Sequence, residues 1–429
     1  MNKHNRALQF VLFLSLTISL ALTACSDART TIVFVFLSSS PDTLRAYWQD
    51  VIADFEAANP DVRVDLRVYK WKDGQPEINR MIEQGRPPDL INEGVRRVPE
   101  YVAAGLVELV DDYLTPEFKD QFIPLFIEEG SRYQGRTFGL PMSLSARVLY
   151  YNKDLLARAG YDAPPQSWEE LRTVALAVSR LSSLGENSFK SEVYGFGIPA
   201  SPGTIETSTY FYYFLWGNGG QVFSPDGTKA GFGAPEGVEA LTFLNELVQS
   251  GATPPDPWVY TRQDMEDAFV AGKLGMVITL PGLVNRLAQE APDLDFGLAT
   301  IPFNVAPVTP LVEDTLIMFK TSEHKDVTWR FIEFIYQDEY RRAYADLVGV
   351  LPEKITVAQD PDIAARYAFF LELVPDGKFE PLNIESAEVG NLVGEAVRQV
   401  YQGQLDPAAA LEAAAAQAVE RLAYSAGSW

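Results

Sequence analysis

Cysteine, histidine and long apolar runs are scarce in this sequence. Its 429 residues include one cysteine, Cys25, and two histidines, His4 and His324. A single cysteine excludes a disulfide within the chain, and two distant histidines exclude a histidine-ligated zinc site and a Ser-His-Asp triad. The sequence has no GxxxxGK phosphate loop and no dinucleotide-binding glycine pattern. We therefore expect neither a metal nor a cofactor.

The one long apolar run lies near the amino terminus, from Ala7 to Leu22, behind a basic start. It is shorter than the ~20 residues of a membrane-spanning helix and is typical of a secretory signal, so residues 1–24 are predicted to be a signal peptide. The segment Leu22-Thr23-Ala24-Cys25 resembles the lipobox of bacterial lipoproteins. This resemblance implies cleavage before Cys25, lipidation of that residue, and an extracytoplasmic protein anchored to the cell membrane. The alternative is an ordinary signal with an incidental cysteine.

The remaining composition is that of an acidic globular protein. The formal net charge is −23 and 47% of the residues are hydrophobic. A surface this acidic repels nucleic acids, which excludes them as partners. About 400 residues are more than one hydrophobic core usually organises, so we expect two domains.

Strand and helix patterns alternate from the start of the mature chain. Continuous apolar residues predict a buried strand over Thr31–Leu37, and helical spacing of apolar residues predicts a helix from Pro41. A strand over Val62–Val68, a helix over Pro76–Gln84 and a strand over Asp89–Ile91 follow. This βαβαβ order predicts a parallel α/β domain.

The α/β pattern continues to the carboxyl terminus. Ser167 and Glu170 form a capping box that predicts the start of a helix, and the glycines after Trp216 predict the end of another. Further strands are expected over Leu274–Leu280 and Thr315–Phe319. No long linker separates two halves, so two domains would require the chain to cross between them more than once.

Several segments in this order resemble the extracellular solute-binding proteins of bacterial carbohydrate importers, the family of maltodextrin- and glycerol-phosphate-binding proteins. The segments are FEAANP (55–60), AGLVELVDDYL (104–114), YYNKDLLARAGYDAPPQSW (150–168), WGNGG (216–220), FVAGKLGMV (269–277) and GVLP (349–352).

The resemblance implies a two-lobed periplasmic-binding-protein type II fold of the α/β class, with three crossing segments and a ligand cleft between the lobes. Lobe one would be residues 25–148 and 303–349, and lobe two residues 149–302 and 350–429. It also implies a monomeric binder without enzymatic activity. Such a protein captures a sugar or oligosaccharide and delivers it to the permease subunits of an ABC transporter.

Candidate ligand contacts follow from the rule that open α/β sheets bind ligands at the carboxyl ends of their strands, and from family positions. Carboxylates and amides satisfy sugar hydroxyls, and aromatic rings cover the apolar faces of the sugar. Polar candidates are Ser39, Ser40, Asn92, Glu93, Ser143, Ser145, Glu313 and Asp314. Gly282 and the aromatic residues Trp71, Trp216 and Trp258 complete the set.

Other interpretations stay open for these residues. Glu93 could pair with Arg96 or Arg97, Trp216 could belong to the core of its helix, and Trp71 is expected on an exposed loop. The segment from Glu385 to Gly394 lacks the arginine that the glycerol-phosphate type carries there, which argues against that ligand. The identity of the sugar is left open.

Two alternative functions also remain. Glu93 and Glu313 on facing loops of one cleft would satisfy the minimum requirement of a glycoside hydrolase, two carboxylates across a sugar. A protein of this kind could instead act as a ligand-gated adaptor for a membrane sensor.

Overall fold

The computed structural model describes residues 29–183 and 192–427. The predicted signal peptide and Cys25 lie outside these ranges. Within the part of the chain that is described, no helix is long and apolar enough to cross a membrane.

The predicted βαβαβ unit is confirmed. Its elements are β1 (Thr30–Ser38), α2 (Pro41–Ala58), β2 (Val62–Lys70), α3 (Trp71–Glu83) and β3 (Leu90–Gly94). Strand β1 lies between β2 and β3 and is parallel to both. Proline at the first position of α2 fits the start of a helix, and the buried face of α2 includes Trp48 and Phe55.

These strands belong to a mixed six-stranded sheet with the order β12-β11-β3-β1-β2, in which β6 also pairs with β11. Strand β11 is antiparallel to β3 and β6, whereas β12 is parallel to β11. The remaining elements of this part are α4 (Val98–Ala103), α5 (Pro116–Lys119), β4 (Arg132–Tyr133), β5 (Arg136–Thr137), β6 (Leu140–Ala146), β11 (Thr309–Met318), α12 (Lys325–Ile335), α13 (Asp338–Val348) and β12 (Gly377–Phe379).

A second, four-stranded sheet has the order β10-β7-β9-β8. Its strands and the helices between them are β7 (Val148–Asn152), α6 (Lys153–Arg158), α7 (Trp168–Arg180), β8 (Tyr194–Gly197), α8 (Glu206–Gly217), α9 (Pro235–Gln249), α10 (Arg262–Val270), β9 (Leu274–Thr279), α11 (Gly282–Glu290) and β10 (Phe296–Ala299). The later helices are α14 (Ile355–Ala358), α15 (Pro361–Arg366), α16 (Ala368–Leu373), α17 (Ser386–Tyr401) and α18 (Pro407–Gly427).

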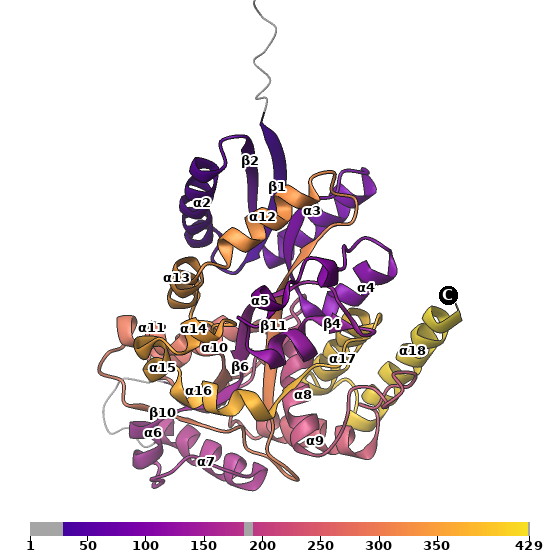
Figure 1. Cartoon of the computed structure of the whole chain (residues 1–429). Coiled ribbons are helices and arrows are strands. Elements are labelled where there is room, and N and C mark those ends of the chain that lie inside the picture. Colours follow the sequence, from indigo (N-terminus) through magenta and orange to yellow (C-terminus); the bar gives the residue numbers. More distant parts are fainter. Residues whose placement is uncertain (1–28, 184–191, 428–429) are drawn as a thin grey trace, which may run out of the picture.

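The two sheets lie in different parts of the molecule (Figure 1). Strands β1 and β2 with α2 form one end, and α6, α7 and α9 lie toward the other. Buried apolar residues form one cluster around Phe34 and Trp48 and a separate one around Phe211 and Leu244. The chain passes from the first sheet to the second at Arg147, the single residue between β6 and β7, and returns between Ala299 and Thr309.

Local signals predicted several element boundaries correctly. Ser167 and Glu170 form the expected capping box at the start of α7. Helix α8 ends at Gly217, and Gly219 has a φ of 80°, the left-handed conformation that glycine adopts without steric cost.

The predicted starts of two elements, α3 and β11, were wrong. Helix α3 begins at Trp71 and contains Pro76, so Trp71 does not lie on a loop. Strand β11 begins at Thr309, six residues before the predicted start. Its first residues pair with β12 and β6, which come from distant parts of the sequence and leave no local signal.

Candidate functional site

The predicted carboxylate and amide residues of the first sheet lie inside strands, not on the loops that follow or precede them. Asn92 and Glu93 belong to β3, and Glu313 and Asp314 belong to β11. The two strands are antiparallel neighbours, and Asp314 lies opposite Gly94. The backbone pairing between β3 and β11 therefore fixes the positions of these four residues.

Asn92 has a structural role in this position. Its side-chain oxygen accepts a hydrogen bond from the Leu37 backbone nitrogen at 2.6 Å, and its amide nitrogen donates to the Leu37 carbonyl at 3.0 Å. Both ends of the amide are used to fix the last residues of β1. Ser39 and Ser40, which follow that strand, are exposed.

The structure brings Glu93, Asp314 and Ser143 together. Ser143 Oγ donates to Asp314 Oδ2 at 3.1 Å, and the Gly94 backbone nitrogen donates to Glu93 Oε1 at 2.9 Å. Burial raises the pKa of Glu93 to about 7, although the Arg97 guanidinium opposes this, and the nearby Asp314 raises it further. Burial also raises the pKa of Asp314 to about 6. Desolvation of this kind is common where carboxyl groups line a functional site.

Glu313 lies apart from this group. Ser131 Oγ donates to Glu313 Oε1 at 2.9 Å, and Oε2 has no hydrogen-bond partner among the described residues. Burial raises the pKa of Glu313 well above its ordinary value, although the hydrogen bond from Ser131 opposes this. The expectation that Glu93 and Glu313 stand on facing loops was wrong, because both are buried in strands of one sheet.

The tryptophan candidates are packed to different degrees. Trp71 is half-buried against the cluster that includes Leu37. Trp216 is 5% exposed within α8, and the Lys378 ammonium lies 5.2 Å from the centre of its ring. Trp258 lies in a short 3-10 helix and packs half-buried against the core of the second sheet.

Two small residues complete the predicted set. A Cβ atom added at Gly282 would lie 3.0 Å from the Val348 carbonyl oxygen, so glycine here permits close contact between the start of α11 and the end of α13. Ser145 Oγ donates to the Val312 carbonyl at 3.5 Å, across the β6–β11 pair.

A buried charge network that sequence reasoning missed connects α8, α10 and β9 with the crossing at Arg147. Arg262 Nε donates to Glu206 Oε1 at 3.0 Å, and Arg262 also pairs with Glu266, which accepts from Thr279. The same Glu206 oxygen is 3.8 Å from Arg147 Nη2. Burial opposes ionisation of Glu206, but Arg147 and Arg262 outweigh it and lower its pKa.

A second missed network surrounds Arg96. Its guanidinium pairs with Glu380, donates to Ser208 Oγ at 3.2 Å and to Thr209 Oγ1 at 2.9 Å, and lies 5.8 Å from the ring centre of Tyr212. Arg96 follows β3 of the six-stranded sheet, whereas its hydroxyl partners lie on α8. The side chain therefore links elements associated with the two sheets.

Several polar atoms around these networks are buried without a hydrogen-bond partner among the described residues. We call Arg96, Arg147, Glu206, Arg262, Glu266 and Glu380 the buried charge cluster. The unpartnered atoms beside or within it are Nε and Nη1 of Arg147, the hydroxyls of Ser201, Tyr212 and Tyr213, and Oε1 of Glu380. A buried polar group without a partner costs about 1–3 kcal/mol, so this concentration makes the buried charge cluster a candidate binding site.

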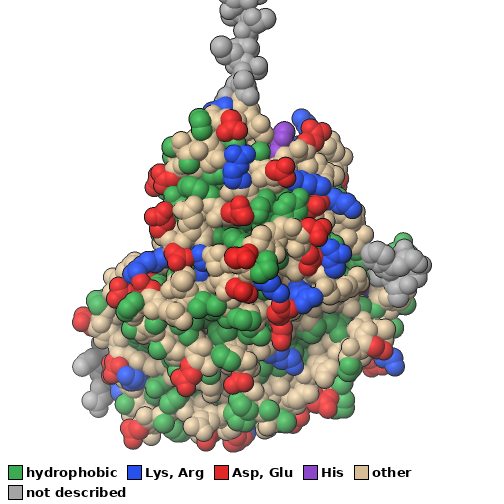
Figure 2. Space-filling model, viewed as in Figure 1, with side chains coloured by type: hydrophobic (Ala, Val, Ile, Leu, Met, Phe, Trp, Pro, Cys, Tyr) green, Lys and Arg blue, Asp and Glu red, His purple; other side chains and the backbone are tan. Residues whose placement is uncertain are grey.

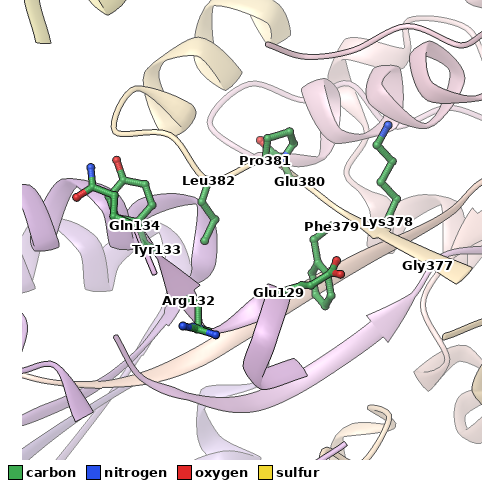
Figure 3. Close-up of a pocket in the computed structure, with 10 residues that line it drawn as sticks. All are labelled: Glu129, Arg132, Tyr133, Gln134, Gly377, Lys378, Phe379, Glu380, Pro381 and Leu382. Carbon is green, nitrogen blue, oxygen red and sulfur yellow. The ribbon is translucent and has the colours of Figure 1, made fainter. Parts of the chain in front are cut away.

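A cavity of about 440 Å³ lies next to one end of the cluster (Figure 3). It is lined by Glu129 and residues 132–134 from one segment and by residues 377–382 from another. Glu380 also lines the cavity, so the cavity adjoins the Arg96 network. Carboxylates, an amide and aromatic rings in one hollow are the groups that contact sugars.

Metal binding has no support in the described ranges 29–183 and 192–427. No group of three or more histidine, cysteine, aspartate or glutamate side chains there is arranged to hold a metal ion. The carboxylates of the buried charge cluster are instead paired with arginines.

Sequence comparison places the chain in a family. The family model described as "Bacterial extracellular solute-binding protein" matches residues 39–342, and the chain belongs to this family. A protein of Brucella abortus (strain 2308), described as a binding protein, is 34% identical over 93% of this chain and 95% of its own length. The maltotriose-binding protein of Pyrococcus abyssi is 24% identical over 77% of this chain and 68% of its own length.

Solved structures share the fold. A solute-binding protein from Thermotoga lettingae, bound to α-D-tagatose, aligns with a TM-score of 0.81 at 23% identity, over 92% of this chain and 99% of that one. Maltose-bound MalE3 of T. maritima aligns with a TM-score of 0.79 at 21% identity, over 92% and 100% of the two chains. The protein therefore has the two-domain fold of the maltose-binding type, as the sequence predicted.

Proposed function

We propose that this protein captures a sugar or oligosaccharide between two lobes and delivers it to the permease subunits of an ABC importer, without chemical change. The observation that supports this most strongly is the buried charge cluster with its unpartnered polar atoms, between elements associated with the two sheets. Sugar hydroxyls both donate and accept hydrogen bonds, so they could satisfy all of these atoms.

The proposed lobes are residues 25–148 with 303–349, and residues 149–302 with 350–429. The passage of the chain between the sheets at Arg147 supports the first boundary. Strand β12 departs from this division, because it lies in the range of lobe two but pairs with β11 of the first sheet. Closure of the lobes would exclude water and strengthen the hydrogen bonds to the ligand.

The proposed contacts combine predicted and newly found residues. Glu93, Asp314 and Ser143 would bind hydroxyls from the first sheet, and Arg147 and Tyr213 would bind from the crossing and α8. The remaining proposed contacts are Ser39, Ser40, Trp71, Asn92, Ser145, Trp216, Trp258, Gly282 and Glu313. Of these, the exposed serines and the half-buried Trp71 and Trp258 retain accessible surface, whereas Asn92 and Trp216 are buried.

We further propose that Cys25 carries a lipid that anchors a monomeric protein outside the cytoplasm. Acidic side chains are spread over the visible face of the molecule, mixed with basic ones (Figure 2). With a net charge of −23, such a surface disfavours nucleic acids and anionic lipid head groups, so attachment would rely on the lipid.

Calorimetry and thermal-shift measurements with maltotriose, maltose and diacetylchitobiose test the central proposal. A sugar at 100 times its Kd should stabilise the native state by about 2.7 kcal/mol, and chromatography should recover it intact. Steady release of shorter sugars, abolished by Glu93→Gln, would instead indicate a glycoside hydrolase. Binding that activates a membrane sensor without transport would indicate the adaptor function.

A further inference from the structure

The start of helix α8 combines three features that point to one kind of ligand group. Arg147 is 5% exposed, and its Nε and Nη1 atoms have no hydrogen-bond partner among the described residues. Ser201, just before α8, and Tyr213, within it, carry buried hydroxyls that are also unpartnered. No side chain caps the amino-terminal end of the helix at Ile205.

These groups lie close to one another. Glu206, the first residue of α8, is 3.8 Å from Arg147. The Ser201 carbonyl accepts from Thr207 Oγ1 at 3.3 Å, which holds Ser201 against the first turn of the helix. Burial raises the pKa of Tyr213, and the Arg147 guanidinium is near enough to oppose this effect.

The site has more donors than acceptors. A guanidinium can only donate hydrogen bonds, and Glu206, which lies 3.8 Å from Arg147 Nη2, also accepts from Arg262 at 3.0 Å. Asp314 is close enough to Arg147 for the guanidinium to oppose the rise in its pKa, but its Oδ2 accepts from Ser143. A neutral sugar hydroxyl that accepts a hydrogen bond from these donors also carries a proton, and that proton needs an acceptor of its own. A carboxylate or phosphate oxygen only accepts, and the positive end of a helix dipole favours it.

We infer that the ligand is an acidic sugar, whose carboxylate or phosphate ester binds to Arg147, Ser201 and Tyr213 at the start of α8. This inference rests on the proposed function and specifies the substrate class. Arg147 and Arg262 already face Glu206 and Glu266, so the acidic group would be held by the unpartnered N–H and hydroxyl donors and not by an excess of positive charge.

Calorimetry with sugars matched except at C6 tests the inference. The probes are glucose, glucuronate and glucose 6-phosphate; galactose and galacturonate; and galactotriose and trigalacturonate. In each set, the acidic sugar should bind at least tenfold more tightly than its neutral counterpart. Comparison of glucuronate with glucose 6-phosphate shows whether the site prefers a carboxylate or a phosphate ester. Arg147→Gln should remove this preference with a loss of about 10- to 100-fold in affinity, the range for a hydrogen bond to a charged group.

Two variants guard against a folding artefact. Tyr213→Phe removes a hydroxyl that has no hydrogen-bond partner among the described residues, so it should weaken binding of the acidic sugar only, while thermal stability stays constant. Arg172→Gln, at the surface of α7, is the matched control. It should change the affinity for neither the acidic nor the neutral sugar.

Tighter binding of the neutral sugars, or an acidic preference that survives Arg147→Gln, would overturn the inference and leave sugar capture intact. Failure of every sugar, neutral or acidic, would contradict sugar capture itself.

Discussion

Replacement of Glu93 by glutamine should make the protein more stable at neutral pH and leave it almost unchanged in acid. Glu93 is 2% exposed, and burial raises its pKa to about 7, from an ordinary value of 4.5. Between these two values the folded protein holds a proton that the unfolded chain has released. The free energy of unfolding of the wild type therefore falls as the pH rises through this window.

The size of the effect follows from the two pKa values. Each tenfold change in proton affinity is worth about 1.4 kcal/mol, so the full penalty for ionising Glu93 in the folded state is about 3 kcal/mol. Glutamine keeps an oxygen that can accept from the Gly94 nitrogen, the bond that measures 2.9 Å in the wild type. The advantage of Glu93→Gln should be near zero at pH 4.5, grow through pH 7 and then level off.

Urea-induced unfolding followed by tryptophan fluorescence, repeated from pH 4.5 to 8.5, measures this difference. Glu412→Gln provides the control, because Glu412 is an exposed residue of α18. A stability difference between Glu93→Gln and the wild type that does not vary with pH would refute the reasoning. So would a mutant that is less stable than the wild type at pH 8.

Three other outcomes are expected. Arg341→Met should lower the free energy of unfolding by about 3–5 kcal/mol in urea titrations, because it leaves the buried Glu353 carboxylate unpaired; unchanged stability would contradict this. Trp258→Ala should weaken sugar binding in calorimetry by about 1–2 kcal/mol with little change in Tm, whereas a large Tm loss at constant affinity would make it a core residue. Cys25→Ala should move the exported protein from the membrane to the soluble fraction, and retention in membranes would disprove the anchor.

Elements that depend on local sequence could be predicted. The continuous apolar run of β1 and the helical spacing in α2 are patterns within about 20 residues. The capping box at Ser167 is a pattern of four residues. Strand β11 was misjudged at its start, because Thr309–Leu311 becomes a strand by pairing with β12, about 70 residues away in the sequence. No local window contains that information.

The candidate site was predicted only in part, for a related reason. The carboxylates of the first sheet could be found from their positions at the ends of predicted strands, although Asn92 proved to be committed to the backbone of β1. Arg147 left a signal that was not used, since it is the one charged residue in the segment from Ser143 to Tyr151. Glu206 left a similar signal, because it is an acidic residue at the start of a helix that is buried on all sides.

The polar atoms that are buried without a partner occur in two settings, one inside the apolar cores and one near the proposed binding site. Trp48 and Trp168 each leave an indole nitrogen unpartnered among the described residues, but both belong to apolar clusters that fill space around the sheets. The unpartnered atoms of Arg147 lie instead where α8 meets the crossing between the sheets, near Tyr213, which itself belongs to the apolar cluster of the second sheet. Burying charged groups that are so incompletely bonded costs free energy, because desolvation is not fully recovered by pairing. The apolar cores offset that cost, and a ligand that completes these bonds would stabilise the folded protein.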